Sequence, residues 1–133
     1  MTGEPEWAVR GIDTKRANVA RVYDYWLGGY HNFLADQDAA RAIAAVSPTA
    51  PAIGRANRAF LGRAVRFLAA AGIRQFLDIG AGLPTQGNVH EVAQQASPGA
   101  RVSYVDIDPV AVAHSEAILA GNDDATVIQA DLR

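Results

Sequence analysis

Ten residues, Phe76 to Thr85, constrain the fold more than any other stretch of this chain; they read Phe-Leu-Asp-Ile-Gly-Ala-Gly-Leu-Pro-Thr. Phe76, Leu77 and Ile79 are apolar and prone to extended structure, as in a short buried strand. Gly80 and Gly82 follow at once, and because they lack a Cβ atom they permit positive φ and close approach of the backbone to a bound molecule. The amides of the next helix would point at that molecule. The stretch therefore predicts a nucleotide-type site or, on the simpler alternative, a tight turn without a ligand.

Helical and extended patterns alternate around this turn. The sequence predicts helices at residues 13–29, 36–46, 51–71, 88–96 and 109–119, and strands at residues 76–79, 102–105 and 126–130. Strands that alternate with helices form a parallel sheet wound by right-handed crossovers, with ligands at the carboxyl ends of the strands. We therefore expect an α/β fold, a Rossmann-like parallel sheet with the first of these strands in the middle, behind an N-terminal helical block.

The longest helical pattern, over residues 51–71, has an apolar side and a basic side. Its apolar side chains fall on one broad arc: Ile53, Ala56, Phe60, Leu61, Ala64, Val65, Phe67, Leu68 and Ala71. The opposite arc carries Arg55, Arg58, Arg63 and Arg66. We expect the apolar arc to pack on the sheet and the arginines to lie in solvent. Gly54 and Gly62 each cost about 1 kcal/mol relative to alanine in a helix, which suggests close approach of another element.

The first helical pattern carries three aromatic side chains within four residues, Tyr23, Tyr25 and Trp26. One narrow core face does not hold so many rings, so we expect at least one of them to meet a groove or a ligand. Packing in the core alone is the alternative explanation.

The composition excludes several classes of function. The chain has no cysteine, so it forms no disulfide, Cys-ligated zinc site or thiol nucleophile. His31 has no second histidine at ligand spacing, so we expect it at the surface or in a local hydrogen bond, and we expect no metal site. Residues 1–74 hold ten of the twelve basic side chains. Because these are not interleaved with exposed aromatics and the whole chain is acidic, a nucleic-acid partner is not expected.

The N-terminal residues, about 1–13, show no periodicity and are expected to form a flexible arm. The stretch Met-Thr-Gly-Glu-Pro-Glu has neither a basic n-region nor an apolar h-region, and no apolar run approaches about 18 residues. We therefore expect a cytoplasmic protein without a membrane partner.

Each predicted strand of the sheet ends near an acid. Asp78, Asp106 and Asp131 should lie side by side, because the carboxyl ends of parallel strands meet at one edge. Asp106 follows Gly80 by 26 residues and is placed to accept hydrogen bonds from both ribose hydroxyls of a nucleotide. Asp131 would stand by the base and accept from an exocyclic amine, with a plain loop acid as the alternative. Asp108 is explained fully as a helix N-cap.

These motifs resemble those of a known enzyme family. Asp78-x-Gly80-x-Gly82, followed by Val-Asp106-Ile-Asp108-Pro, resembles the first and second motifs of class I S-adenosylmethionine-dependent methyltransferases. Four stretches are similar to the bacterial S-adenosyl methyltransferase family once known as domain of unknown function 574: Ala17–Gly29, Asn32–Asp36, Asn57–Leu61 and Phe76–Thr85. The similarity covers nearly the whole chain from about residue 14.

The resemblance implies S-adenosylmethionine as the cofactor. The cofactor-binding residues that it implies are Asp78, Gly80, Gly82, Asp106, Ile107, Asp131 and Tyr23. The two glycines would face the methionine and ribose part, Asp106 would hold the ribose, and Asp131 would lie near the adenine. Residues 14–72 would cover the site as a lid, and residues 73–133 would form the first half of the binding domain. No catalytic residue is assigned, since no candidate has a visible partner that would tune its pKa.

The family sheet is expected to have seven strands, of which this chain supplies three. We therefore expect the N-terminal part of a methyltransferase that acts on an unknown small-molecule acceptor. The free edge of a strand as apolar as Phe-Leu-Asp-Ile predicts self-association. Two alternatives stay open: a non-catalytic S-adenosylmethionine-binding or interaction module, and an NAD-dependent oxidoreductase half-domain. Thr85 at the third glycine position of Gly-x-Gly-x-x-Gly disfavours the second alternative.

Overall fold

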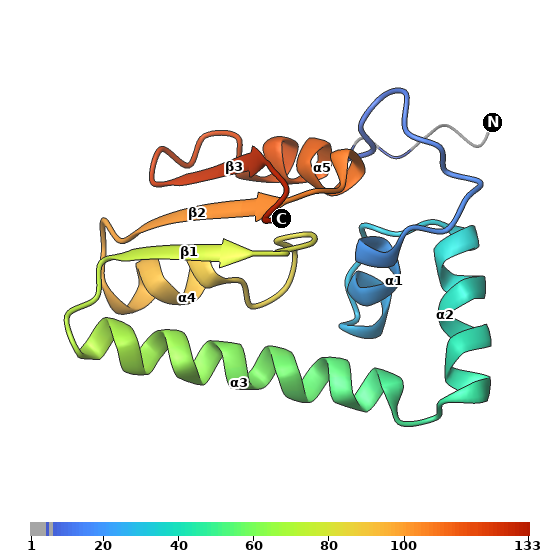
Figure 1. The fold of residues 1–133 in the computed structure, drawn as a ribbon, viewed down its shortest axis with the longest axis horizontal. Helices are drawn as coiled ribbons and strands as arrows, with labels where there is room; N and C mark the ends of the chain where they lie inside the picture. Colours follow the sequence, from blue (N-terminus) through green and yellow to red (C-terminus); the bar gives the residue numbers. More distant parts are fainter. Residues whose placement is uncertain (1–4, 6) are drawn as a thin grey trace.

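The computed structural model describes residue 5 and residues 7–133, so the predicted N-terminal arm lies partly outside the described residues. The described chain contains α1 (Val19–Trp26), α2 (Leu34–Val46), α3 (Ala50–Ala70), β1 (Gln75–Ile79), α4 (Val89–Ala96), β2 (Arg101–Asp106), α5 (Pro109–Leu119) and β3 (Ala125–Gln129). The alternation after α3 confirms the predicted α/β fold. The strands point toward α1, and α3 runs alongside the sheet (Figure 1). Within the described part, none of these helices has the length and apolar character needed to cross a membrane.

The three strands form a parallel sheet in the order β1-β2-β3. Phe76 of β1 lies opposite Val102 of β2, which lies opposite Ala125 of β3. Among the described residues β1 is an edge strand, because both crossovers step in the same direction and one side of β1 has no neighbouring strand. The prediction that the first strand lies in the middle concerned a sheet with further strands and stays a prediction.

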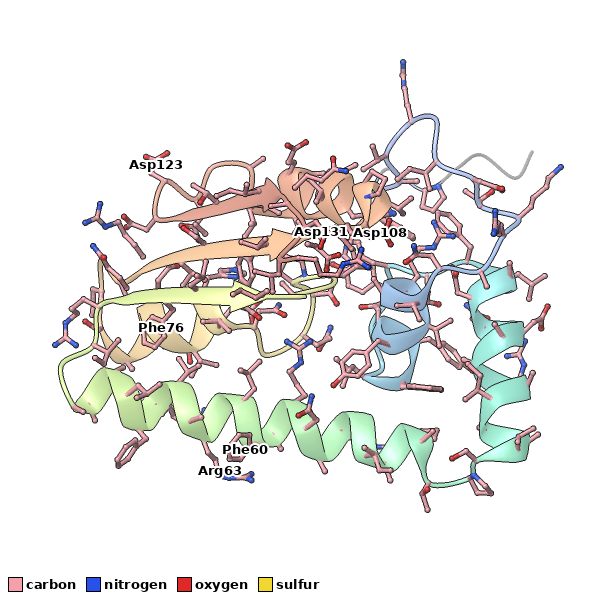
Figure 2. All side chains as sticks on the ribbon, viewed as in Figure 1. Phe60, Arg63, Phe76, Asp108, Asp123 and Asp131 are labelled. Atoms are coloured by element: carbon pink, nitrogen blue, oxygen red, sulfur yellow. The ribbon has the colours of Figure 1, made fainter. Side chains whose placement is uncertain are left out.

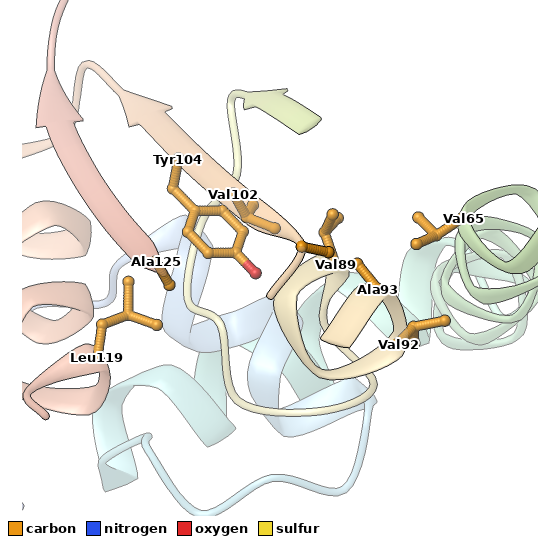
Figure 3. Close-up of a cluster of buried hydrophobic side chains, with 9 residues drawn as sticks. Val65, Val89, Val92, Ala93, Val102, Tyr104, Leu119 and Ala125 are labelled. Carbon is orange, nitrogen blue, oxygen red and sulfur yellow. The ribbon is translucent and has the colours of Figure 1, made fainter. Parts of the chain in front are cut away.

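Helices α4 and α5 pack on one face of the sheet. The main core cluster joins them to that face and to α3 (Figure 3), and it comprises Val65, Val89, Val92, Ala93, Ala100, Val102, Tyr104, Leu119 and Ala125. Alternate side chains of a strand point to opposite faces. On the opposite face Leu77, Ile79 and Ile128 are 44–64% exposed. The described residues therefore cover one face of this sheet and leave the other open.

The inward side of α3 consists of small residues. Its buried residues are Gly54, Gly62, Val65 and Ala69. Ile53, Phe60 and Phe67 of the apolar arc are 61–74% exposed. The prediction that the apolar arc packs inward is therefore wrong for these three residues, whereas Val65 of the same arc belongs to the core cluster and Leu61 packs against it. Because α3 packs against α4 and α1, its contact side needs residues small enough for the helices to approach each other.

Two helices begin at other residues than predicted. α1 starts later because Asn18 caps it, with its Oδ1 accepting hydrogen bonds from two amides of the first turn. α2 begins at Leu34, so Asp36 lies inside the first turn and is not the N-cap. There the Oδ2 atom of Asp36 accepts hydrogen bonds from the Phe33 amide at 2.8 Å and from Nε of Arg21 at 2.9 Å. This buried ion pair ties α1 to α2.

Candidate functional site

The glycine turn after β1 forms one wall of a cavity at the carboxyl ends of the strands. Gly80 and Gly82 have φ angles of 69° and 64°, which glycine adopts far more readily than other residues. The cavity has a volume of about 570 Å³ and lies between this turn, α1 and α3. Asp78, Asp106 and Tyr23 line it together with the two glycines. Five of the seven predicted cofactor-binding residues therefore meet in one place.

Asp106 is held rigidly at the end of β2. Its Oδ2 atom accepts a hydrogen bond from the Gly82 amide at 2.8 Å, and its Oδ1 atom accepts one from the Asp108 amide at 2.9 Å. Each oxygen of a carboxylate can accept a second hydrogen bond, so both remain available to a ligand. The acid that was predicted to hold a ribose thus also fixes the glycine turn beneath it.

A second hollow, of about 400 Å³, continues the site along the strand ends. It is lined by Gly80, Asp106, Ile107 and Asp131, among others. Gly80 and Asp106 line both cavities, so the two cavities adjoin each other at the strand ends. Asp131 also binds Arg133, with 2.8 Å between Oδ2 and Nη2, and this hydrogen bonding lowers the pKa of Asp131. The remaining two predicted residues, Ile107 and Asp131, therefore lie in the same region as the other five.

A cation and an acid that sequence reasoning did not pair face each other across the larger cavity. Arg58 and Asp78 both line it. Burial raises the pKa of Asp78, the charge of Arg58 acts against this shift, and Asp106 adds to it. Arg58 was predicted to lie in solvent because it sits on the basic arc of its helix; it is instead half-buried. Periodicity alone could not reveal that the Arg58 side chain lines this cavity.

Tyr23 fixes the contact between α1 and α3. Its hydroxyl donates a hydrogen bond to the carbonyl of Gly54 at 3.0 Å and accepts one from Nδ2 of Asn57 at 3.2 Å. A Cβ atom at Gly54 would lie 3.4 Å from the Tyr23 ring, which confirms the close approach that this glycine predicted. Tyr23 and Trp26 also line the cavity, so the prediction that an aromatic side chain meets a groove is confirmed.

Polar side chains of the helical block bind the loops that follow β1 and β2. Nδ2 of Asn18 donates to Oδ2 of Asp108 at 2.6 Å. The hydroxyl of Thr85 donates to Oδ1 of Asp24, whose Oδ2 accepts from Nδ2 of Asn32 at 2.8 Å. Asp24 is only 2% exposed. Sequence reasoning missed Asp24 and Thr85 as a pair, because nothing local signals a contact between residues so far apart in the chain.

His31 does not lie at the surface. It is 8% exposed and packs between the rings of Trp7 and Tyr30, with centroid distances of 4.8 and 4.4 Å. Burial lowers its pKa, and the charge of Asp24 acts in the opposite direction. The prediction of a surface position is therefore wrong. Within residues 5 and 7–133, no three His, Asp or Glu side chains are grouped so as to hold a metal ion.

The fold and the site together define a class of protein. A parallel sheet with a glycine turn after its first strand and an acid after its second is the arrangement of α/β domains that bind nucleotide-type cofactors at the strand ends. Residues 5–133 match the family described as S-adenosyl methyltransferase. The chain belongs to this family, which confirms the resemblance seen in its motifs. No curated protein matches it.

Two crystal structures of relatives are similar to this chain. One is of a proposed methyltransferase from Thermobifida fusca YX, with 48% sequence identity and a TM-score of 0.84 over 96% of this chain and 48% of that chain. The other is of a DUF574 family protein from Streptomyces avermitilis MA-4680, with 46% identity and a TM-score of 0.77 over 90% of this chain and 47% of that chain. The chain thus spans about half the length of the structures that it matches.

Proposed function

We propose that this chain is the S-adenosylmethionine-binding part of a methyltransferase that acts on a small-molecule acceptor. The observation that carries the proposal is that Gly80 and Asp106 line both of two adjoining cavities at the strand ends, one of which Asp131 also lines. Membership of the S-adenosyl methyltransferase family supports the choice of cofactor. Because the chain spans about half the length of the matched structures, we assign cofactor binding to it and methyl transfer to the whole protein.

The nucleoside part of the cofactor fits the acids at the ends of β2 and β3. Both oxygens of Asp106 keep a lone pair, so the carboxylate can accept from two ribose hydroxyls while it holds the glycine turn. Asp131 is placed to accept from the exocyclic amine of adenine. Ile107 offers an apolar side chain, 53% exposed, against which the base can pack.

The amino-acid tail of the cofactor fits the larger cavity. That tail carries a carboxylate and an ammonium group, and the cavity presents a matching cation and acid in Arg58 and Asp78. A guanidinium binds a carboxylate through two parallel hydrogen bonds. The positive φ angles of Gly80 and Gly82 let the backbone lie directly beside the tail.

Bound S-adenosylmethionine would supply an electrophilic methyl group on its sulfonium sulfur. The residues of the larger cavity contribute positioning, which accounts for much of the rate gain in reactions of this kind. Tyr23 already attracts one cation, since the Arg58 guanidinium carbon lies 5.7 Å from its ring centroid. The Tyr23 and Trp26 rings therefore offer faces to which a second cation, the sulfonium, is attracted.

Calorimetric titration with S-adenosylmethionine, its demethylated product and NAD tests the proposal. We expect the first two to bind and NAD to fail. Asp106→Asn should weaken cofactor binding about tenfold or more, because it removes charge-assisted hydrogen bonds to the ribose, worth about 1.5–3 kcal/mol. The matched control is Asp123→Asn, an exposed acid at the opposite end of the sheet (Figure 2). A preference for NAD, no binding by a folded sample, or an equal loss in the control would refute the assignment.

A binding module without turnover is the second candidate, because the described site residues line cavities suited to a cofactor and none of them is assigned a catalytic role. Both candidates bind the cofactor, so the titration does not separate them. Production of the demethylated cofactor in the presence of an acceptor does separate them.

A further inference from the structure

A groove lined by arginines runs along α3, separate from the proposed cofactor cavity. It has a volume of about 370 Å³ and lies between α3 and the loop that leads into α4. Arg55, Arg58 and Arg66 line it together with Gln86 and Gly87 of that loop. None of the described residues that line it is acidic. Its walls are therefore strongly positive.

The three guanidinium groups are closer together than their sequence spacing suggests. The side chain of Arg66 folds back toward the N-terminal end of its helix, so that Nη1 and Nη2 lie 3.6 Å from where a Cβ atom of Gly62 would be. That position is one helical turn nearer to Arg58. The three charges thus extend over about 10 Å of helix, from residue 55 to residue 62, at the rise of an α-helix.

The groove arginines bind neutral groups instead of acids. Nη1 of Arg55 approaches the carbonyl of Trp26 at 3.4 Å, and Nη1 of Arg58 donates to Oδ1 of Asn88 at 3.0 Å. The described part of the chain forms three ion pairs, and none of them includes Arg55, Arg58 or Arg66. The neighbouring positive charges of these arginines repel one another. An anion bound between them would be attracted by each arginine, and this attraction would offset the repulsion.

Two acids nearby limit the kind of anion that fits. Asp78 lies on the cofactor side of Arg58 and does not line the groove. Glu91, in the first turn of α4, is exposed and approaches Nδ2 of Asn88 at 3.5 Å. A long polyanion that leaves the groove would meet Glu91, whereas a compact one would not. The groove therefore favours a small ligand over a nucleic acid.

We propose that this groove is a binding site for a small molecule that carries a phosphate or diphosphate group. The forked guanidinium group of arginine matches phosphate oxygens in pairs, and the volume of the groove is that of a small-molecule site. The site is distinct from the cofactor cavity, although Arg58 lines both. It does not depend on the proposed function.

Calorimetric titration of the 133-residue chain with inorganic pyrophosphate at low salt tests this site. We expect one site, and a loss of affinity of about tenfold for Arg55→Gln and for Arg66→Gln. The matched control is Arg63→Gln: Arg63 is on the same helix, is exposed and points away from the groove (Figure 2), so affinity should change by less than about twofold. S-adenosylmethionine is titrated against the same variants to separate the two sites. Its affinity should not change in Arg55→Gln or Arg66→Gln, because neither arginine lines its proposed cavity.

Three results would overturn the proposal. The first is no pyrophosphate binding by a sample that is folded by circular dichroism. The second is an equal loss of affinity in Arg63→Gln, which would indicate diffuse charge attraction without a site. The third is tighter binding of a DNA or RNA oligonucleotide that all three variants weaken alike, with a steep salt dependence. Failure of S-adenosylmethionine to bind, with the pyrophosphate pattern intact, would remove only the proposed function.

Discussion

Gly29 is expected to be intolerant of any side chain, although its backbone conformation is not the left-handed one. A Cβ atom at Gly29 would lie 2.7 Å from Oδ2 of Asp24 and closer still to Oδ1. The carboxylate of Asp24 is buried and has little room to move away. Its two oxygens accept hydrogen bonds from Asn32 and Thr85, which hold α1 to the turn after β1. Gly29→Ala must therefore displace the carboxylate and break at least one of these bonds.

The expected loss follows from the hydrogen bonds of that carboxylate. A hydrogen bond to a charged group contributes about 1.5–3 kcal/mol, so the loss of both bonds, or of one with a buried donor left unpaired, costs about 3 kcal/mol. If the free energy of unfolding falls by about 2 kcal/mol per molar urea, this loss lowers the urea concentration at the midpoint of unfolding by about 1.5 M. Urea unfolding followed by circular dichroism measures this shift.

Two comparisons test whether the cost of Gly29→Ala arises from its contact with the Asp24 carboxylate. Gly62→Ala should be neutral or stabilise by up to about 1 kcal/mol, because its Cβ atom would make only an ordinary contact with Arg66 and alanine favours helix. In an Asp24→Ala background the clash is gone, so Gly29→Ala should then cost less than about 1 kcal/mol. The reasoning fails if Gly29→Ala costs under about 1 kcal/mol in the natural sequence, or costs the same with and without the carboxylate.

Two further predictions concern pH and association. Burial lowers the pKa of His114 from 6.5 to about 4. As pH falls below about 6.5, the unfolded chain therefore binds a proton at this histidine while the folded chain does not, and the free energy of unfolding decreases. The loss between pH 7 and pH 5 should be about 2 kcal/mol by urea unfolding, and His114→Leu should lack this component; identical pH profiles would contradict it. Leu77 is 64% exposed on the edge strand β1, so Leu77→Lys should reduce self-association in sedimentation velocity. Strong hydrogen-exchange protection of Leu77 and Ile79 in a monomer would count against this.

The glycine turn and the acids around it were predictable because their signals are local. Gly80 and Gly82 follow directly on a β-prone run, and a parallel sheet brings Asp106 and Asp131 to the same edge whatever the details of packing. The alternation of strands and helices defined the fold class for the same reason. Strand position was not predictable in this way, since the place of β1 in the sheet depends on which neighbouring strands are present.

The contacts of the helical block were not predictable, because they join residues that are distant in sequence. Asp24 and Thr85 are 61 positions apart, and no local pattern predicts a hydrogen bond between them. The packing side of α3 was misjudged for a related reason. Hydrophobicity predicted that Phe60 and Phe67 would be buried, but the neighbouring helices approach so closely that the contact side needs glycine and alanine.

Arg58 lines both cavities on α3 and is half-buried, whereas Arg55, Arg63 and Arg66 are exposed as predicted. Its guanidinium faces Asp78 in the larger cavity, and it also lines the arginine groove, where it binds Asn88. If an anion in the groove changes cofactor affinity, linkage requires that the cofactor change anion affinity by the same factor. Arg58 lines both cavities, so such an effect would be expected to pass through its side chain.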